Sequence, residues 1–270
     1  MAGGADSDEI EHWLNRDFEI PALAAIEKAV TDERLSIQEW QAIIRFLAAQ
    51  DVRTPARFYE SMVRWQKELP AMLDEILGGS VADLEEAIRT GVRPESVAHP
   101  YGDHVPFKVH KEFEPGAEHG KLHIETIAGR GLWLFSMRQL LTRTVNALLQ
   151  HKWTILKCPA GISWMTSDDP VVKLNFESAD KFDFGGGWGS HGTEIFMPLS
   201  PEHLLYTRIG FRPAHRGTVL SPDEARNFQR FIVLHGHRFI FASRLHQELP
   251  EIRQRYVSAE GYRLDKLLMW

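Results

Sequence analysis

The sequence predicts an α+β fold, with a helical N-terminal half packed on a mostly antiparallel β-sheet in the C-terminal half. Up to about residue 151, apolar residues recur every three or four positions, as they do on one face of a helix. After residue 152 the apolar runs are short, β-branched or aromatic, and separated by turn residues, as in strands. We expect a single compact domain over 1–270, with a helical part at about 8–151, a sheet-rich part at about 152–245 and a short terminal helix at about 249–257.

The helices of the first half are predicted from amphipathic stretches and from their boundary residues. The stretch 9–18 is amphipathic, and four helix starts follow from cap or proline residues: Pro21, Ser36 with Glu39 as a capping box, Thr54–Pro55, and Ser80. Residues 92–117 show little periodicity, so we expect a long loop there. The longest helix is predicted over 118–151, with kinks at Gly129 and Gly131.

The second half is predicted to hold six strands and a helix. The strands are expected at 153–157, 162–166, 171–174, 194–198, 204–209 and 239–242. Ser221, followed by proline and two acids, predicts a helix that runs to about His235. The glycine pattern at 187–192 matches a dinucleotide fingerprint in letters only, because a strand pattern follows it and no helix. We read 184–192 as a mobile loop and a lid over Asp168.

Composition excludes several classes of function. The net charge of −6 and the pI near 6.1 argue against a dedicated nucleic-acid-binding patch or a membrane-surface protein. The single cysteine, Cys158, excludes an intrachain disulfide and a cysteine-cluster zinc site. No secretory signal and no apolar run of membrane-spanning length is present, so we expect a cytoplasmic protein. A small molecule or another protein is the expected partner.

The stretch Ser167-Asp168-Asp169-Pro170 is the main candidate site. One interpretation is a tight turn that joins strands 162–166 and 171–174, since aspartate and proline favour turns. The other is a pair of carboxylates at a strand end, which hold a divalent cation such as Mg²⁺ or act as acid and base. Lys173 lies four positions after Asp169, a spacing that echoes nuclease sites.

Four short motifs resemble the domain of unknown function 4238 family. The stretch LAAQDVRTP at 47–55 resembles the family's Q-x-x-R-T-P signature, and TSDDPV at 166–171 resembles T-S-D-N-P-V. FMPLSP at 196–201 and Asn227 are similar to two further family positions. Asp169 replaces the usual asparagine, which adds a charge, and the upstream His-Tyr-Val-Pro segment of the family is missing. The resemblance implies a shared fold and polar residue set rather than a reaction.

The resemblance adds Gln50 and Arg53 to the candidate residues. They are three positions apart on one helix face, and we expect Arg53 to pair with Asp168 or Asp169. In the first hypothesis the chain is a hydrolase for a phosphodiester or nucleotide-like substrate. Its site combines these residues: Asp168, Asp169, Arg53, Asn227, Ser167 and Gln50, with Asp168 and Asp169 as the metal ligands. In the alternative, the chain is a non-catalytic binding or regulatory domain in which Arg53 and Asp168 form a structural clamp.

The histidines suggest a weaker metal hypothesis. His119 and His123 have the i, i+4 spacing of zinc sites, but the zincin pattern would need glutamate where Gly120 stands. We therefore expect a solvated loop. His235 is interpreted as a cation at a helix end, with a catalytic role as the alternative.

Overall fold

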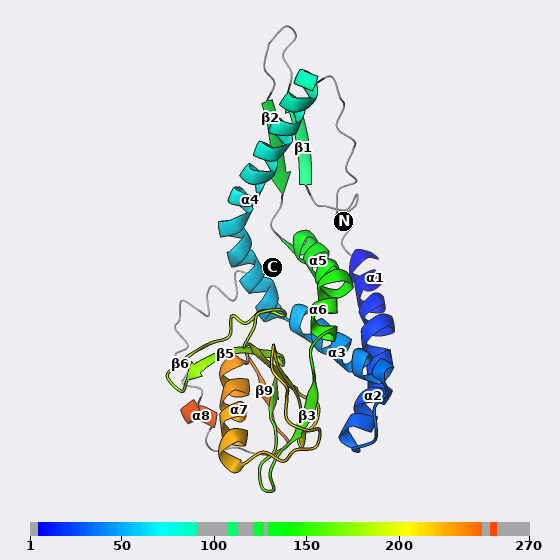
Figure 1. Cartoon of the computed structure of the whole chain (residues 1–270), viewed down its shortest axis with the longest axis vertical. Helices are drawn as coiled ribbons and strands as arrows, with labels where there is room; N and C mark the ends of the chain where they lie inside the picture. Colours follow the sequence, from blue (N-terminus) through cyan, green and yellow to red (C-terminus); the bar gives the residue numbers. More distant parts are fainter. Residues whose placement is uncertain (1–4, 91–106, 113–120, 127–128, 245–248, 253–270) are drawn as a thin grey trace. The chain divides into compact units, whose positions relative to one another are not determined.

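The computed structural model describes residues 5–90, 107–112, 121–126, 129–244 and 249–252 (Figure 1). The α+β prediction is confirmed, with helices in the N-terminal half and an antiparallel sheet in the C-terminal half. The chain forms two compact units, one of residues 1–47 with 149–270 and one of residues 48–148. We describe each unit by itself, and the prediction of a single compact domain stays a prediction.

Three helices begin the first unit. α1 (Ala5–Leu14) passes through the π-helical turn η1 (Asn15–Glu19) into α2 (Ile20–Val30), so the predicted second start at Pro21 lies in a continuing helical chain. α3 (Ile37–Val52) begins with the predicted capping box. The Ser36 backbone N–H donates to Glu39 Oε2 at 2.7 Å, and the Glu39 N–H donates to Ser36 Oγ at 3.2 Å.

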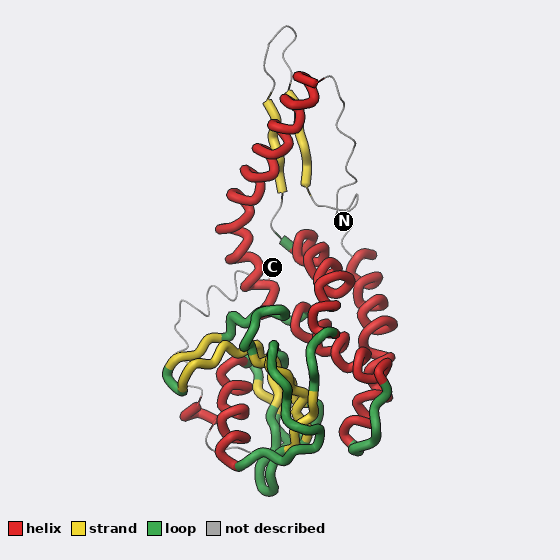
Figure 2. Tube along the Cα trace, in the orientation of Figure 1, coloured by secondary structure: helices red, strands yellow, loops and turns green. Residues whose placement is uncertain are grey.

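A five-stranded antiparallel sheet forms the centre of the first unit (Figure 2). Its spatial order is β3 (Thr154–Lys157), β8 (His203–Arg208), β7 (Glu194–Pro198), β5 (Val172–Ser178) and β6 (Lys181–Asp183). The predicted strand 194–198 is confirmed in its bounds, while β6 was not predicted. In the register, Phe196 lies opposite Val172 on one side and Tyr206 on the other.

α7 (Pro222–His235) packs on one face of this sheet, as Figure 1 shows. Its capping box at Ser221 and Glu224 confirms the predicted start. The buried cluster between α7 and the sheet includes three residues of α7 itself, Ala225, Phe231 and Ile232. Its other members are Leu156, Trp164, Val172, Leu174, Phe196 and Leu204. Lys157 and His203 alternate with members of this cluster, so they point to the opposite face, where both reach Asp32 between α2 and α3.

A separate two-residue ladder joins β4 (Thr166–Ser167) to β9 (Ile240–Phe241). The predicted hairpin between 162–166 and 171–174 is therefore wrong, because β4 pairs with β9 and β5 pairs with β6 and β7. Within the predicted strand 162–166, only Thr166 pairs with another strand, opposite Phe241. The terminal helix α8 covers Leu249–Ile252, and its predicted continuation lies outside the described residues.

The second unit contains the long helix α4 (Pro55–Thr90) and a β-hairpin. α4 begins at the predicted Thr54–Pro55 boundary and runs through Ser80, so a separate helix start at Ser80 is wrong. The hairpin pairs β1 (Phe107–Glu112) with β2 (Lys121–Thr126). β1 lies within the predicted loop 92–117, so the loop prediction is wrong at 107–112. The other residues of the predicted loop lie outside the described residues.

The predicted helix over 118–151 is wrong at its start. Its residues Lys121–Thr126 form β2, in which the apolar residues Leu122 and Ile124 alternate with polar ones and the strand pairs with β1. The helical part is α5 (Arg130–Gln139), which Gly129 precedes as its N-cap, then η3 (Leu140–Thr144) and α6 (Val145–Leu149). Among the helices in the described ranges, none combines the length and the apolarity needed to cross a membrane.

Candidate functional site

Asp168 ties the end of β4 to the backbone that follows α7. Its Oδ1 accepts the N–H groups of His237 at 2.9 Å and Arg238 at 3.0 Å, and its Oδ2 accepts the Arg238 N–H at 2.8 Å. The Asp168 N–H donates in turn to the Phe239 carbonyl at 3.2 Å. Such charge-assisted bonds are stronger than neutral ones. These hydrogen bonds join two segments that are about seventy residues apart in the sequence. We call the bonds of Asp168 to His237, Arg238 and Phe239 the Asp168 latch.

Ser167 and Gly236 explain how closely these segments approach. The Ser167 hydroxyl accepts the Asp169 N–H at 3.2 Å and donates to the Asp169 carbonyl at 2.8 Å, which closes a tight local turn. A Cβ at position 236 would lie 2.9 Å from the Ser167 Cβ and 2.6 Å from a methyl group of Ile240. Glycine is therefore required between the two histidines for the latch to close.

Asp169 and His235 form a buried pair beside the latch. Their side chains are 2% and 4% exposed, and His235 Nε2 lies 3.6 Å from Asp169 Oδ2. The other ring nitrogen, Nδ1, lies 3.0 Å from the Asp169 carbonyl oxygen. Both neighbours of the ring are oxygen atoms that can accept a hydrogen bond. The Phe184 ring packs edge-on against the His235 ring with centroids 5.1 Å apart.

The predicted lid loop begins at this pair. Phe184 is its first residue, and the loop is bonded back to the sheet by the Gly186 N–H to the Lys173 carbonyl at 3.3 Å and by the Gly192 N–H to the Ile209 carbonyl at 2.9 Å. The strand β7 follows the loop, whereas a dinucleotide-binding fingerprint would be followed by a helix. The role of a mobile lid stays a prediction.

α7 contributes a buried glutamine in place of the predicted asparagine. Asn227 is exposed on α7 and does not join Ser167, Asp168 and Asp169. Gln229, two residues later, is 6% exposed, and its Oε1 accepts the Met165 N–H at 3.2 Å. The signal that identifies Gln229 is a polar residue at an apolar position of the helical repeat, between Ala225 and Ile232.

The two remaining candidates belong to the second unit. Gln50 lies on α3 and Arg53 directly follows that helix. Their predicted meeting with Asp168 or Asp169 stays a prediction. Within the second unit, sequence reasoning missed a buried ion pair in which Arg57 Nε lies 3.0 Å from Asp51 Oδ1, with the Asp51 side chain 2% exposed.

The metal hypotheses find little support in the geometry. Within the described ranges, no three histidine, cysteine, aspartate or glutamate side chains come together as a metal-binding group. Asp168 and Asp169 thus have no third protein ligand among the described residues. His123 lies on β2 opposite His110, so the helical spacing with His119 does not exist; His119 itself lies outside the described residues.

Cys158 is half-buried, and burial raises the pKa of its thiol to about 11. The thiol therefore stays protonated near neutral pH, which argues against a nucleophilic role.

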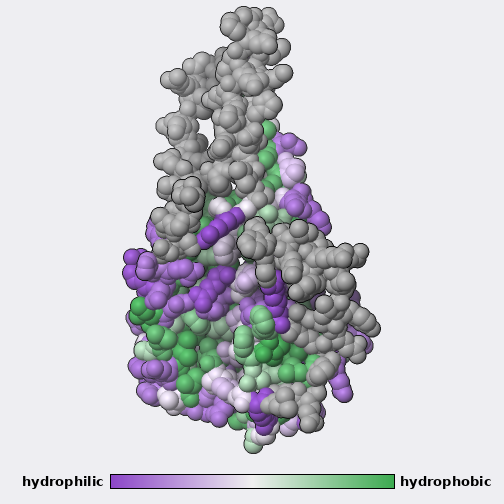
Figure 3. All heavy atoms as spheres, turned by 180° about the vertical axis from the view of Figure 1, so that it is seen from behind, coloured by the Kyte–Doolittle hydropathy of each residue, from purple (hydrophilic) through white to green (hydrophobic). Residues whose placement is uncertain are grey.

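A pocket of about 320 Å³ lies next to the latch, and we call it the β4–β9 pocket. It is lined by 164–166, 198–201 and 241–243, which are parts of or adjoin the TSDDPV, FMPLSP and β9 stretches. Trp164 is 3% exposed, and its backbone N–H donates to the Pro201 carbonyl at 2.7 Å, joining two of the walls. Phe241 on the third wall is 54% exposed. Figure 3 shows one face of the molecule, on which hydrophobic and hydrophilic residues are mixed.

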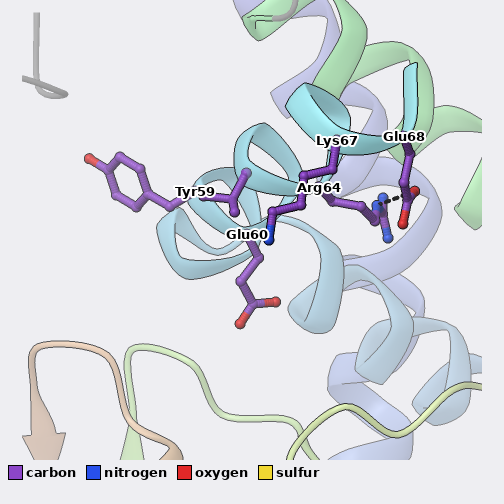
Figure 4. Close-up of a pocket in the computed structure, with 6 residues that line it drawn as sticks. Tyr59, Glu60, Arg64, Lys67 and Glu68 are labelled. Carbon is purple, nitrogen blue, oxygen red and sulfur yellow. Dashed lines mark ion pairs between the residues drawn. The ribbon is translucent and has the colours of Figure 1, made fainter. Parts of the chain in front are cut away.

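A second pocket, of about 560 Å³, lies along α4 (Figure 4). Its described lining comes from one face of this helix: Tyr59, Glu60, Val63, Arg64, Lys67 and Glu68. Arg64 and Glu68 form an ion pair at 3.7 Å with both side chains more than half exposed. Exposed pairs of this kind are common on helix surfaces, so the groove has no convergent chemistry to interpret.

Comparison with known proteins places the chain by sequence. A family model described as protein of unknown function (DUF4238) matches residues 2–246. The chain therefore belongs to the DUF4238 family, as its motifs predicted. No curated protein and no solved structure matches it.

Proposed function

We propose that this DUF4238 protein is a binding domain whose ligand is a nucleotide-like molecule seated in the β4–β9 pocket. The observation that carries the proposal is the lining of the pocket, in which two of the three stretches, 164–166 and 198–201, overlap the TSDDPV and FMPLSP motifs that resemble those of the family. Its volume of about 320 Å³ suits a small ligand. Phe241, which is 54% exposed, supplies aromatic surface, and the lining includes three hydroxyl residues, Thr166, Ser200 and Ser243. A planar base with hydrogen-bonding edges matches this combination.

The alternative is the hydrolase that would use Asp168 and Asp169. It receives less support, because the Asp168 oxygens accept backbone N–H groups and Asp169 faces His235. The contacts of Asp168 with the backbone N–H groups of His237 and Arg238 support a structural role for Asp168, as in the predicted clamp. The part of that clamp assigned to Arg53 stays a prediction.

The test is calorimetric titration of the full chain with adenosine and with AMP. We expect saturable binding that weakens about 5- to 150-fold in Phe241→Ala, since one base–aromatic contact contributes roughly 1–3 kcal/mol. Phe211→Ala is the matched control, because Phe211 is 44% exposed in the same unit but does not line the pocket. Absence of binding, or equal loss in both variants, would refute the proposal.

The two ligands separate the roles of base and phosphate. Arg244 follows the pocket residue Ser243 directly, and its guanidinium donates to the Gly161 carbonyl at the surface. If this guanidinium also meets a phosphate, AMP binds more tightly than adenosine, and the difference shrinks as salt is added. Equal affinities would restrict the recognised group to the base and sugar.

A further inference from the structure

A chain of hydrogen-bonding side chains lies at the end of the sheet, apart from the Asp168 latch. Ser200 Oγ lies at hydrogen-bond distance from His203 Nδ1, 2.9 Å, whereas His203 Nε2 lies 3.6 Å from Asp32 Oδ1, which is too long for a hydrogen bond. The second oxygen of Asp32 is bonded by the Lys157 ammonium group. All four residues belong to the first unit. Serine, histidine and aspartate therefore follow one another in space, although they come from the α2–α3 turn and the β7–β8 turn.

The backbone determines which way the protons point in this chain. Ser200 Oγ accepts the N–H groups of Glu202 and His203, both at 3.1 Å. Its own hydrogen is then available for His203 Nδ1. A neutral imidazole that accepts at Nδ1 carries its hydrogen on Nε2, the nitrogen that faces Asp32. The His203 side chain is only 4% exposed, so the ring is held between these two partners.

Asp32 occupies an unusual backbone conformation at its end of the chain. Its φ of 63° is the one positive value at a residue other than glycine in the ranges that the structure describes. This left-handed region disfavours residues with a Cβ, and residues held there often have functional roles. The bond from Lys157 lowers the pKa of the Asp32 carboxyl, so Asp32 is an anion at neutral pH. An anion at this position stabilises positive charge on the His203 ring.

We propose that Ser200 is a nucleophile that hydrolyses small carboxylic esters, with His203 as its base and Asp32 as the residue that positions His203. This activity goes beyond the proposed binding of a nucleotide. Ser200 is partly exposed and belongs to the lining of the β4–β9 pocket, so a small acyl group has a path to it. The ring nitrogens are used in the opposite order from the serine proteases, with Nδ1 toward serine and Nε2 toward aspartate.

The reaction proceeds in two steps that balance. Ser200 Oγ attacks the ester carbonyl carbon while its proton passes to His203 Nδ1, and the alcohol leaves with that proton, so an acyl-serine remains. Water then attacks the acyl carbon and gives its proton to His203, which returns a proton to Ser200 as the carboxylic acid leaves. The N–H groups of Glu202 and His203 lower the cost of negative charge on Ser200 Oγ, and Asp32 offsets the charge of the imidazolium. The mechanism requires the 3.6 Å between His203 Nε2 and Asp32 Oδ1 to shorten when an ester binds, as catalytic hydrogen bonds often do.

The competing explanation is that Ser200 only stabilises the β7–β8 turn. Serine hydroxyls often accept N–H groups two and three residues later in turns. A fluorophosphonate probe distinguishes the two roles, because it forms a covalent bond with activated serines and the site can be mapped by peptide mass spectrometry. Mapping on the wild-type chain needs no variant, so a folding defect in a variant cannot obscure the result.

We expect the probe to attach to Ser200 in the wild-type chain. Labelling should fall at least about 100-fold in His203→Gln, since removal of a general base costs roughly that factor or more. Ser178→Ala should label like the wild type, because Ser178 is an exposed serine at the end of β5. Hydrolysis of p-nitrophenyl acetate should follow the same order.

Absence of label on Ser200, or equal labelling of wild type and His203→Gln, would overturn the proposal and leave Ser200 as a turn residue. This result would say nothing about AMP, whose binding is read by calorimetry. Failure of AMP to bind would in the same way leave the labelling experiment valid.

Discussion

Replacement of Asp168 by asparagine tests the latch most directly. The carboxylate accepts three contacts from two backbone N–H groups, those of His237 and Arg238, at 2.8–3.0 Å. Hydrogen bonds to a charged group contribute roughly 1.5–3 kcal/mol each. Asparagine keeps one oxygen for one of these donors, but it loses the charge and turns an NH₂ group toward the other donor. We expect the free energy of unfolding of the first unit to fall by about 2–3 kcal/mol.

The assay is urea denaturation followed by tryptophan fluorescence. With a slope of about 2 kcal/mol per M, this loss moves the midpoint down by about 1–1.5 M of urea. Hydrogen exchange of the amides at His237 and Arg238 should accelerate in Asp168→Asn. Asp180→Asn is the control, because Asp180 is exposed in the turn between β5 and β6. Changes at such surface positions usually stay within about 0.5 kcal/mol.

Two results would refute the latch. One is a loss no larger than that of Asp180→Asn, with unchanged exchange at the two amides. The other is a rise of several degrees in the melting temperature of the wild type, but not of Asp168→Asn, when Mg²⁺ is added. This second result would mean that the carboxylate binds a cation, and it would restore the metal-dependent hydrolase.

Three further outcomes follow from buried and paired side chains. Gln229→Leu should cost about 1–3 kcal/mol in urea unfolding, since it leaves a buried N–H without its acceptor, whereas Asn227→Ala should change little because that side chain is exposed. Burial raises the pKa of Glu194 above its usual value of 4.5, so in the pH range just above 4.5 the folded state binds a proton that the unfolded state has lost. The free energy of unfolding should therefore fall as the pH rises through this range. Melting temperatures measured across this range should depend less on pH in Glu194→Gln. The bond from Lys28 and those from the capping box lower the pKa of Glu39 to about 2, and carboxyl NMR titration of Lys28→Met should show it moving up toward 4.5.

Local signals in the sequence were sufficient for the elements whose stability is local. The capping box at Ser36 and the helix start at Ser221 could be predicted because all their partners lie within three residues. The strand Glu194–Pro198 could be predicted because it is a short apolar and aromatic run bounded by turn residues, and its three central residues are buried in the structure. The helical and sheet-rich halves followed from the same kind of evidence.

Errors arose where pairing with a distant segment determines the structure. In Lys121–Thr126 the apolar residues Leu122 and Ile124 alternate with polar ones, as in a strand, but the predicted helix over 118–151 joined Leu122 to the helical pattern that follows, and the partners in Phe107–Glu112 could not be seen locally. The Asp-Asp-Pro stretch was predicted as a hairpin turn because local preferences say nothing about a partner seventy residues away in β9. For the same reason the sequence indicated Asp168 as important but could not show that its oxygens face the backbone at 237–238.

The assembly of one unit from 1–47 and 149–270 has a consequence for synthesis of the chain. The turn that carries Asp32 leaves the ribosome more than a hundred residues before Lys157 and His203, the sheet residues that it contacts. At a synthesis rate of roughly 5–20 residues per second, α2 and α3, which flank Asp32, are made on the order of ten seconds before the sheet residues that Asp32 contacts. Their apolar residues are exposed to chaperones and to other nascent chains throughout that interval, so the yield of folded protein depends on translation speed through 48–148.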